Sequence, residues 1–370
     1  MTEVSISGTE FLLDGRPTYE GRTFEGHRIQ GLLFNVRAVQ ATFDDANPAT
    51  RHHWAYPDTG EWDAERNVAE FCAALPSWRD HGVLAFTVNF QGGGPLYVPE
   101  IYENYDNNGF TPEGDLKPAY ADRMARVLAR ADELGMAVIV GLFYCVHLKK
   151  LRGQEAMWRA ADEALKFLEG TGCRNILIEV ANEVEVVLRH TGHEIFRPER
   201  THEMVEELRA AHPGFLYSTS QRGANAETGS GMPPPSLVDE VDYLLFHGNG
   251  TRAPQLEAVI KAIQAMPEYQ RNPKPLVINE DSPGIPNLEV AWRHGVSWGY
   301  FDQGYGGPAA WDGDAYMDYR SQPRESRYED LSGFQTPPVN WTINTEQKRA
   351  FFKRVAEITG APAAWYCNRS

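Results

Sequence analysis

The sequence predicts an α/β fold, a closed (β/α)₈ TIM barrel, because eight short apolar runs alternate with helical patterns along most of the 370 residues. The runs are rich in Val, Ile, Leu and Phe, which is typical of parallel strands covered on both faces. They lie at 31–36, 83–89, 137–143, 176–181, 215–219, 241–246, 275–279 and 296–301. Any site should lie at the carboxyl ends of these strands, as it does in such barrels.

Amphipathic stretches separate the predicted strands. Pro118 lies near the start of one helical pattern and Gly135 just past its end, which are the positions these residue types favour. Pro76 should kink the helix marked by Val68 and Trp78. Further helices are predicted at 155–169, 198–211, 254–266, 287–294 and 345–358, with one or two helical turns at 236–240.

An open doubly wound sheet is the alternative architecture. The barrel is favoured because no glycine-rich phosphate loop follows the first strand, where the sequence reads Asn35-Val36-Arg37-Ala38. Residues 4–6 and 11–13, with an Asp14-Gly15 turn, predict a hairpin that should plug the amino-terminal mouth of the barrel. We therefore expect a single domain: the hairpin at 1–25, the barrel at 26–360 and a tail at 361–370.

Composition excludes several kinds of partner. The net charge of −16 would repel nucleic acid and anionic membranes. Four widely spaced cysteines indicate reduced thiols rather than a zinc or redox pair. No apolar run approaches the about 20 residues of a membrane span, and the first residues lack the apolar segment of a signal peptide. We expect no nucleic-acid partner, no membrane contact and a cytoplasmic location.

Two predicted connections are long and rich in aromatic residues. One follows the first strand at 38–64, and the other follows the eighth strand at 302–344. Loops that leave the carboxyl ends of barrel strands wall the site, and long loops in a compact domain usually have a function. We expect these two loops to narrow the mouth of the barrel.

Carboxylates end two of the predicted strands. The fourth strand continues into Glu183, and strict alternation places Glu179 and Glu183 on one side with Asn182 on the other. The seventh strand continues into Glu280. Because strands four and seven lie across the barrel from each other, Glu183 and Glu280 should face each other at its mouth. Two facing carboxylates, one protonated and one ionised, are what the hydrolysis of an acetal requires.

The run Glu179-x-x-Asn182-Glu183 resembles the strand-four motif of the clan A glycoside hydrolases, the cellulase-like retaining barrel enzymes. The resemblance is one of pattern and covers nearly the whole chain. It implies that Glu183 is the acid/base, that Asn182 binds the sugar 2-hydroxyl and that Glu280 is the nucleophile. It also implies that Tyr144, in Phe143-Tyr144-x-x-His147, and Trp298 line the substrate.

Other positions depart from the clan's pattern. Asn89 ends the second strand, where the clan commonly has an arginine, and the nearest arginine, Arg37, follows the first strand. His247 stands where many relatives have a histidine, but Asn249 takes the usual place of a tyrosine that bonds the nucleophile. We expect Arg37, Asn89, His247 and Asn249 to complete the polar lining of the substrate site.

These residues predict a glycoside hydrolase that cleaves O-glycosidic bonds with retention. The expected substrate is a neutral oligosaccharide or small glycoside, because two long loops cover the mouth and no binding module is visible. The chemistry requires no metal and no organic cofactor.

Two other classes of function remain open at this point. In a metal-dependent sugar isomerase or epimerase, Glu183, His247 and Glu280 would bind a divalent cation such as Mn²⁺ or Zn²⁺. In a non-catalytic sugar-binding barrel, the same carboxylates would contact a ligand without turning it over.

Overall fold

The computed structural model describes residues 1–93, 104–302, 327–331 and 333–362. Its largest sheet has eight strands in the order β10-β9-β8-β7-β6-β13-β12-β11. In chain order these are β6 (Asn35–Arg37), β7 (Ala85–Asn89), β8 (Ala137–Phe143), β9 (Ile176–Ala181), β10 (Leu216–Ser218), β11 (Leu244–Phe246), β12 (Leu276–Ile278) and β13 (Val296–Tyr300). Every described pairing among them is parallel.

The sheet curls into a closed barrel, in which the first and last of these strands along the chain are neighbours. β6 pairs with β13 through Asn35 and Gly299. Hydrogen bonds bridge the seam between β10 and β11: Asp242 N–H donates to the Tyr217 carbonyl (3.0 Å), Tyr217 N–H donates to Asp242 Oδ2 (2.7 Å), and Leu245 N–H donates to Ser218 Oγ (3.1 Å). The architecture is therefore the predicted (β/α)₈ barrel.

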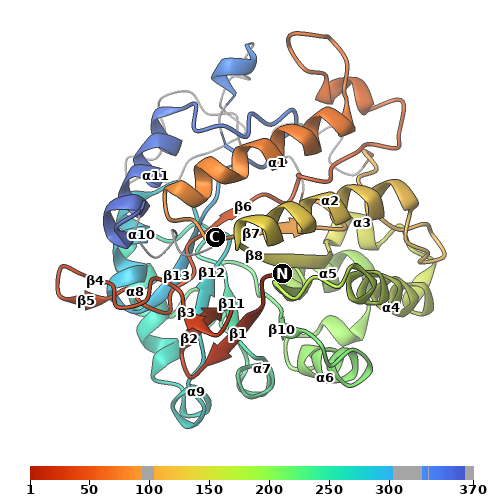
Figure 1. Cartoon of the computed structure of the whole chain (residues 1–370). Helices are drawn as coiled ribbons and strands as arrows, with labels where there is room; N and C mark the ends of the chain where they lie inside the picture. The colour runs from red at the N-terminus through yellow and green to blue at the C-terminus, as the bar shows by residue number, and fades with distance from the viewer. Residues whose placement is uncertain (94–103, 303–326, 332, 363–370) are drawn as a thin grey trace.

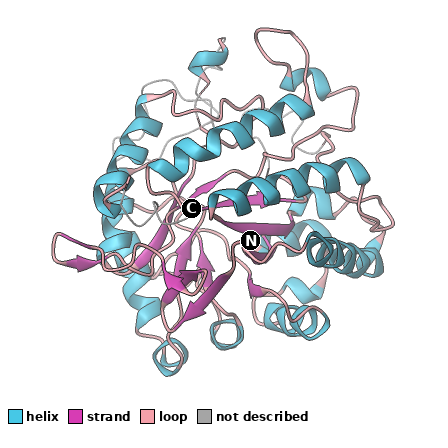
Figure 2. Ribbon diagram, in the orientation of Figure 1, coloured by secondary structure: helices cyan, strands magenta, loops and turns pink. Residues whose placement is uncertain are grey.

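Helices surround the strands (Figure 2). The longer ones are α1 (Ala64–Asp80), α2 (Pro118–Leu134), α4 (Gly153–Thr171), α6 (Thr201–Ala211), α8 (Ala253–Gln264), α10 (Ile285–Arg293) and α11 (Glu346–Thr359). Shorter helices are α3 (Cys145–Leu148), α5 (Val184–Thr191), α7 (Pro235–Glu240) and α9 (Pro267–Arg271), with 3-10 turns at Arg51–Trp54, Glu194–Phe196 and Tyr328–Asp330. As predicted, Pro118 begins α2 and Gly135 ends it, in the left-handed conformation at φ +68°. α1 continues through Pro76 to Asp80.

An antiparallel hairpin covers the amino-terminal mouth of the barrel. It consists of β1 (Val4–Ser7) and β2 (Glu10–Leu13), shown in red in Figure 1. Val4 N–H donates to the carbonyl of Arg174, just before β9, and the Phe11 ring packs edge-on against Tyr243, just before β11. The predicted turn was misplaced. Gly8 and Thr9 connect β1 to β2, whereas Asp14-Gly15 connects β2 to the short strand β3 (Arg16–Pro17). A second small hairpin, β4 (Thr23–Phe24) and β5 (His27–Arg28), follows.

The long loop after β6 is an ordered wall with its own aromatic cluster. Phe43, Trp54, Tyr56 and Trp62 pack together in it. The fully buried carboxylate of Asp45 accepts hydrogen bonds from Trp54 Nε1 (2.7 Å), Thr50 Oγ1 (2.6 Å) and two backbone N–H groups. Of the loop predicted at 302–344, residues 303–326 and 332 lie outside the described part of the structure.

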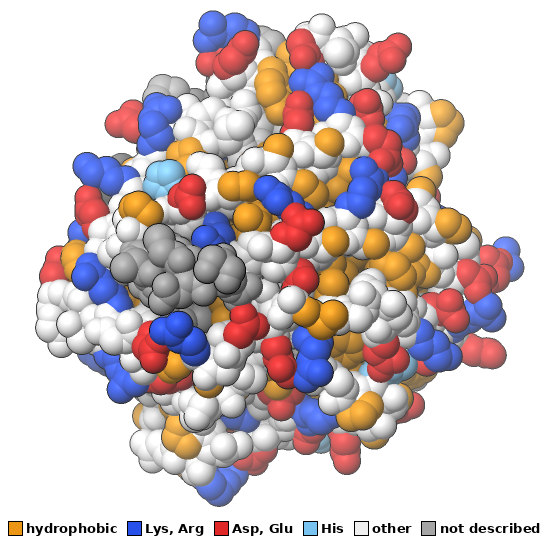
Figure 3. Space-filling model, in the orientation of Figure 1, with side chains coloured by type: hydrophobic (Ala, Val, Ile, Leu, Met, Phe, Trp, Pro, Cys, Tyr) orange, Lys and Arg blue, Asp and Glu red, His pale blue; other side chains and the backbone are white. Residues whose placement is uncertain are grey.

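The face of the molecule in Figure 3 carries acidic and basic side chains interspersed with each other rather than gathered into one basic patch. Among the described residues, no helix has the length and apolar character needed to cross a membrane.

Candidate active site

The carboxyl end of β9 presents two polar side chains to the barrel mouth because the backbone leaves the strand conformation there. β9 ends at Ala181, and Glu183 adopts a left-handed conformation at φ +52° immediately before α5. Side chains with a Cβ rarely adopt this conformation, and such strain tends to occur at functional sites. The turn breaks the alternation of the strand. The prediction that Asn182 points away from Glu183's side was therefore wrong, since Asn182 contacts Arg37 in the same site.

Arg37 connects three strands from the end of β6. Its Nη2 donates to Asn182 Oδ1 (2.6 Å), its Nε forms an ion pair with Glu280 Oε2 (2.7 Å), and its Nη1 lies 4.0 Å from Glu179 Oε2. Its side chain is fully buried, which for a guanidinium requires such partners. Arg37 therefore fixes the relative positions of β6, β9 and β12.

The two predicted catalytic carboxylates lie side by side. His247 Nδ1, after β11, lies 3.1 Å from Glu183 Oε1 and 3.9 Å from Glu280 Oε2. Asn249 Nδ2 donates to the other oxygen of Glu280 at 2.7 Å. One oxygen of Glu183, one oxygen of Glu280 and one ring nitrogen of His247 all lie within 4.8 Å of one another. Glu183, Glu280, Asn182, Arg37, His247 and Asn249 thus form one contiguous cluster.

The surroundings push the pKa values of the two glutamates apart. Burial raises the pKa of Glu183 above its ordinary value, and the neighbouring Glu280 charge adds to this, against the His247 contact. Burial acts on Glu280 too, but Arg37, His247 and Asn249 together outweigh it, so the pKa of Glu280 is lowered. Burial disfavours the charged imidazole of His247, but Glu280 and Glu183 prevail and raise its pKa. These opposite shifts favour the protonated form of Glu183 and the ionised form of Glu280.

A polar layer beneath the pair was not predicted as part of the site. Glu179 is fully buried in the barrel and accepts hydrogen bonds from Ser220 Oγ (2.7 Å) and Asn279 Nδ2 (3.0 Å). Ser220 Oγ also accepts from the backbone N–H of Glu183 at 3.1 Å. Alternation along β9 could have placed Glu179 inside, but no local signal identifies Ser220, which contacts β9 only in the folded chain.

Trp298 does not line the site, and this prediction was wrong. Its neighbour Gly299 lies against Asn35 inside the barrel, so Trp298 points outward, where its ring packs 5.8 Å from Phe351 of α11. Trp298 is fully buried there, and its Nε1 donates to Asp281 Oδ2 at 2.8 Å. The indole therefore belongs to the layer between strands and helices and cannot act as a stacking platform for a sugar.

Asp281 anchors the segment that carries Glu280. Besides the bond from Trp298, its carboxylate accepts from Asn287 Nδ2 (2.9 and 3.1 Å) and from Ser282 Oγ (3.3 Å). Burial raises its pKa from 3.8 to about 6 despite these hydrogen bonds. The Asp281 carboxylate, next to Glu280 in the sequence, therefore points away from the site. It stabilises the loop after β12 rather than interacting with Glu183 and Glu280.

The remaining predicted positions lie at neighbouring strand ends. Asn89 is buried at the end of β7 against Gly141, and neither of its amide atoms has a hydrogen-bond partner among the described residues. Tyr144 is half-buried after β8, with its ring 6.5 Å from that of His147. The His147 ring is itself buried, and neither of its nitrogens has a hydrogen-bond partner within the described part of the chain. No hydrogen bond or ion pair described here joins Asn89 to Glu183 or Glu280.

The Glu183–His247–Glu280 cluster is also the one group of described residues whose ligand atoms lie close enough to hold a metal ion. A carboxylate–imidazole set suits Mn²⁺ or Zn²⁺. However, the Arg37 guanidinium already lies 2.7 Å from Glu280, so a fixed cation occupies the side of that carboxylate which a metal would share.

The fold and the cluster define a barrel with a pair of unlike carboxylates at its carboxyl face, and comparison with known proteins agrees on the fold. No family model and no curated protein matches the sequence. An endo-1,4-beta-D-mannanase from Thermotoga petrophila matches with a TM-score of 0.50 and 14% identity, over 88% of this chain and 99% of that one. A beta-glucosidase from Thermotoga maritima matches with a TM-score of 0.51 and 9% identity, over 90% and 99%. The distant resemblance to clan A glycoside hydrolases is thus confirmed as a likeness of fold.

The buried Asp281 predicts a specific dependence of stability on pH. Because its pKa is raised in the folded state, the fold binds a proton there between pH 4 and 6 that the unfolded chain has lost. Its contribution to stability is therefore greatest in acid and falls as pH rises through this window. We expect the melting temperature of the wild type minus that of Asp281→Asn to decrease from pH 4 to pH 6.5, with a free-energy change of order 2–3 kcal/mol. A difference that stays constant across this range would contradict the assignment.

Proposed function

We propose that this chain is a retaining glycoside hydrolase acting on a neutral oligosaccharide or small glycoside, with Glu183 as acid/base and Glu280 as nucleophile. The observation that carries the proposal is the pair itself. One oxygen of each carboxyl group lies within 4.8 Å of the other, and their pKa values are shifted in opposite directions. Retaining enzymes hold their carboxyl groups about 5–5.5 Å apart, whereas inverting enzymes leave about 6.5–9.5 Å for a water molecule.

In the first step, Glu280 attacks the anomeric carbon while the glycosidic C–O bond breaks. The proton of Glu183 goes to the leaving oxygen, and a covalent glycosyl–enzyme ester remains on Glu280. In the second step, Glu183 takes a proton from water, whose oxygen attacks the same carbon and releases Glu280. Once Glu280 is esterified it carries no negative charge, so it no longer raises the pKa of Glu183, and the ionised Glu183 can act as the base of the second step.

The surrounding side chains orient the pair. Arg37 and Asn249 hold the two oxygens of Glu280, which keeps it ionised and fixes its plane. Arg37 also occupies Oδ1 of Asn182, so the Asn182 amide nitrogen is the end left to donate to a sugar hydroxyl. Hydrogen bonds to the 2-hydroxyl strengthen in the transition state of such reactions. Asn89 and Tyr144, at the adjacent strand ends, extend this lining in the proposal.

Chemical rescue tests the nucleophile. We expect Glu280→Gly to reduce the hydrolysis of aryl glycosides by at least about a thousandfold, because the covalent intermediate can no longer form. Azide should restore turnover of an activated aryl glycoside and give a glycosyl azide of inverted configuration, identified by NMR. Glu268→Gly, at a half-buried position of α9, is the matched control and should retain activity. A rescued product of retained configuration, or a Glu280 variant as active as the wild type, would rule out the assignment.

Removing the Arg37 charge should move the acid limb of the pH–rate profile. Without the guanidinium, burial dominates at Glu280 and its pKa rises, so the ionised nucleophile is lost at a higher pH. We expect kcat/KM of Arg37→Met to fall in acid from a higher pH than in the wild type. Asn249→Ala, which removes one hydrogen bond, should give a smaller shift in the same direction, and Arg37→Lys should give the smallest. Superimposable profiles for Arg37→Met and the wild type would refute this role.

A metal-dependent sugar isomerase is the second candidate function, because Glu183, His247 and Glu280 lie close enough together to bind a divalent cation. It predicts that chelation abolishes the interconversion of free sugars and that Mn²⁺ restores it. The glycosidase proposal instead expects the hydrolysis of aryl glycosides to be unchanged after dialysis against a chelator. Loss of hydrolysis on chelation, restored by metal, would favour the alternative.

A further inference from the structure

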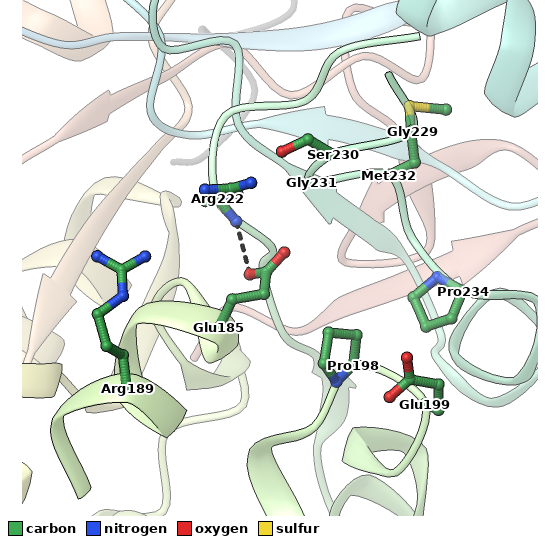
Figure 4. Close-up of a pocket in the computed structure, with 10 residues that line it drawn as sticks. All are labelled: Glu185, Arg189, Pro198, Glu199, Arg222, Gly229, Ser230, Gly231, Met232 and Pro234. Atoms are coloured by element: carbon green, nitrogen blue, oxygen red, sulfur yellow. Dashed lines mark hydrogen bonds between the residues drawn. The ribbon is translucent and has the colours of Figure 1, made fainter. Parts of the chain in front are cut away.

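A groove lies among the segments that follow the carboxyl ends of β9 and β10, the same segments that carry Glu183 and Ser220. Its volume is about 460 Å³, and it is lined by α5, by residues 198–199 before α6 and by the loop 229–234 after β10 (Figure 4). Two of its lining residues, Glu185 and Arg222, lie two positions after Glu183 and Ser220, respectively. Ser220 Oγ accepts the backbone N–H of Glu183, so the two segments that supply Glu185 and Arg222 to the groove are joined beside the proposed acid/base.

The charges in the groove are unevenly placed. Glu185 and Arg189 stand at the spacing of a helical ion pair, but the Glu185 carboxylate turns to the backbone N–H of Arg222 instead, at 3.0 Å. The Gln221 amide lies 3.3 Å from both oxygens of Glu185. Within the described part of the chain, the guanidinium groups of Arg189 and Arg222 form no ion pair. Two guanidinium groups therefore share this end of the groove with one carboxylate.

The opposite end of the groove is apolar and acidic. Pro198 and Pro234 lie there beside Glu199, on the far side from the two arginines (Figure 4). Met232, from the loop 229–234, also lines the groove. A ligand that spans the groove would thus meet hydrocarbon surface and one carboxylate at one end and the two guanidinium groups at the other.

We propose that this groove binds the leaving-group side of the substrate and selects a sugar residue that carries an anionic substituent, a carboxylate or a sulfate or phosphate ester. The inference rests on the proposed function, because the leaving oxygen takes its proton from Glu183 and the leaving group must therefore lie on the side of Glu183. Arginine binds planar oxyanions with paired hydrogen bonds, which neutral hydroxyls cannot match. This inference changes the proposed substrate in one respect: the reacting sugar beside Glu280 is neutral, but the sugar residue that departs carries a charge.

Matched substrates test the proposal. The probes are disaccharides of one glycosyl unit joined to glucuronic acid or to its methyl ester, which differ in a single charge, with the corresponding 6-sulfate and 6-phosphate as further arms. We expect the wild type to cleave at least one anionic form with kcat/KM about tenfold above that of the neutral ester. The preference should shrink as NaCl is raised from 0.05 to 0.5 M, because salt screens exposed charges.

Variants assign the preference to the two arginines. Arg189→Gln and Arg222→Gln should each reduce it, and the double variant should abolish it, while hydrolysis of an uncharged aryl glycoside is unchanged. Arg16→Gln, on the hairpin at the other end of the barrel, is the control and should keep the preference. Equal rates for charged and neutral forms in the wild type, or a preference that survives in the double variant, would overturn the proposal.

A binding measurement separates this proposal from the proposed function. Methyl glucuronoside and its methyl ester are titrated into the wild type and the double variant and followed by calorimetry. Tighter binding of the acid to the wild type alone supports the groove even if no glycoside is cleaved. Equal binding of both probes refutes it even if aryl glycosides are hydrolysed.

Discussion

The site depends on one buried guanidinium. Arg37 lies between two carboxylates, Glu179 and Glu280, and the amide of Asn182, where its charge is surrounded by protein, and burying such a charge is tolerated only with close partners. Its ion pair with Glu280 is therefore an electrostatic requirement in both directions. Without Arg37, the negative charges of Glu179 and Glu280 would face each other in a poorly hydrated interior. With it, Glu280 stays ionised, and that charge in turn raises the pKa of the neighbouring Glu183. The unlike pair is thus a consequence of where this one positive charge is placed.

The backbone contributes a second constraint. Glu183 is held in a conformation that costs about 1–3 kcal/mol for a residue with a Cβ. Ser220 Oγ accepts the Glu183 N–H, and the Ser220 carbonyl accepts the N–H of Val184, so β10 holds the turn at both sides. Glu179, beneath, accepts a hydrogen bond from the Ser220 hydroxyl. The barrel therefore uses a polar interior layer, rather than local sequence preference, to aim the acid/base at its partner.

Sequence patterns predicted the barrel because buried parallel strands and amphipathic helices leave periodic signals that depend only on neighbours along the chain. They also placed Glu183 and Glu280 at strand ends, and the structure brings these residues together. Two kinds of prediction failed. Alternation misplaced Asn182, because period two ends where the strand ends at Ala181. Trp298 was taken for a substrate wall from the resemblance to the clan, and no sequence signal could correct this, because the inner and outer faces of a strand buried on both sides look alike. Ser220 was missed because its role exists only through contact with β9.

The overall charge and the groove act over different distances. A net charge of −16 repels anions at long range, but exposed charges are screened beyond about 8 Å at physiological ionic strength. Within that distance, a ligand at the basic end of the groove interacts mainly with Arg189, Arg222 and Glu185, whose sum is positive. A polyanion would extend beyond this end and meet the repulsion of the surrounding surface, whereas a short glycan with one charge would not. The same surface that disfavours nucleic acid therefore permits a single anionic group, provided that it lies beside the two guanidinium groups.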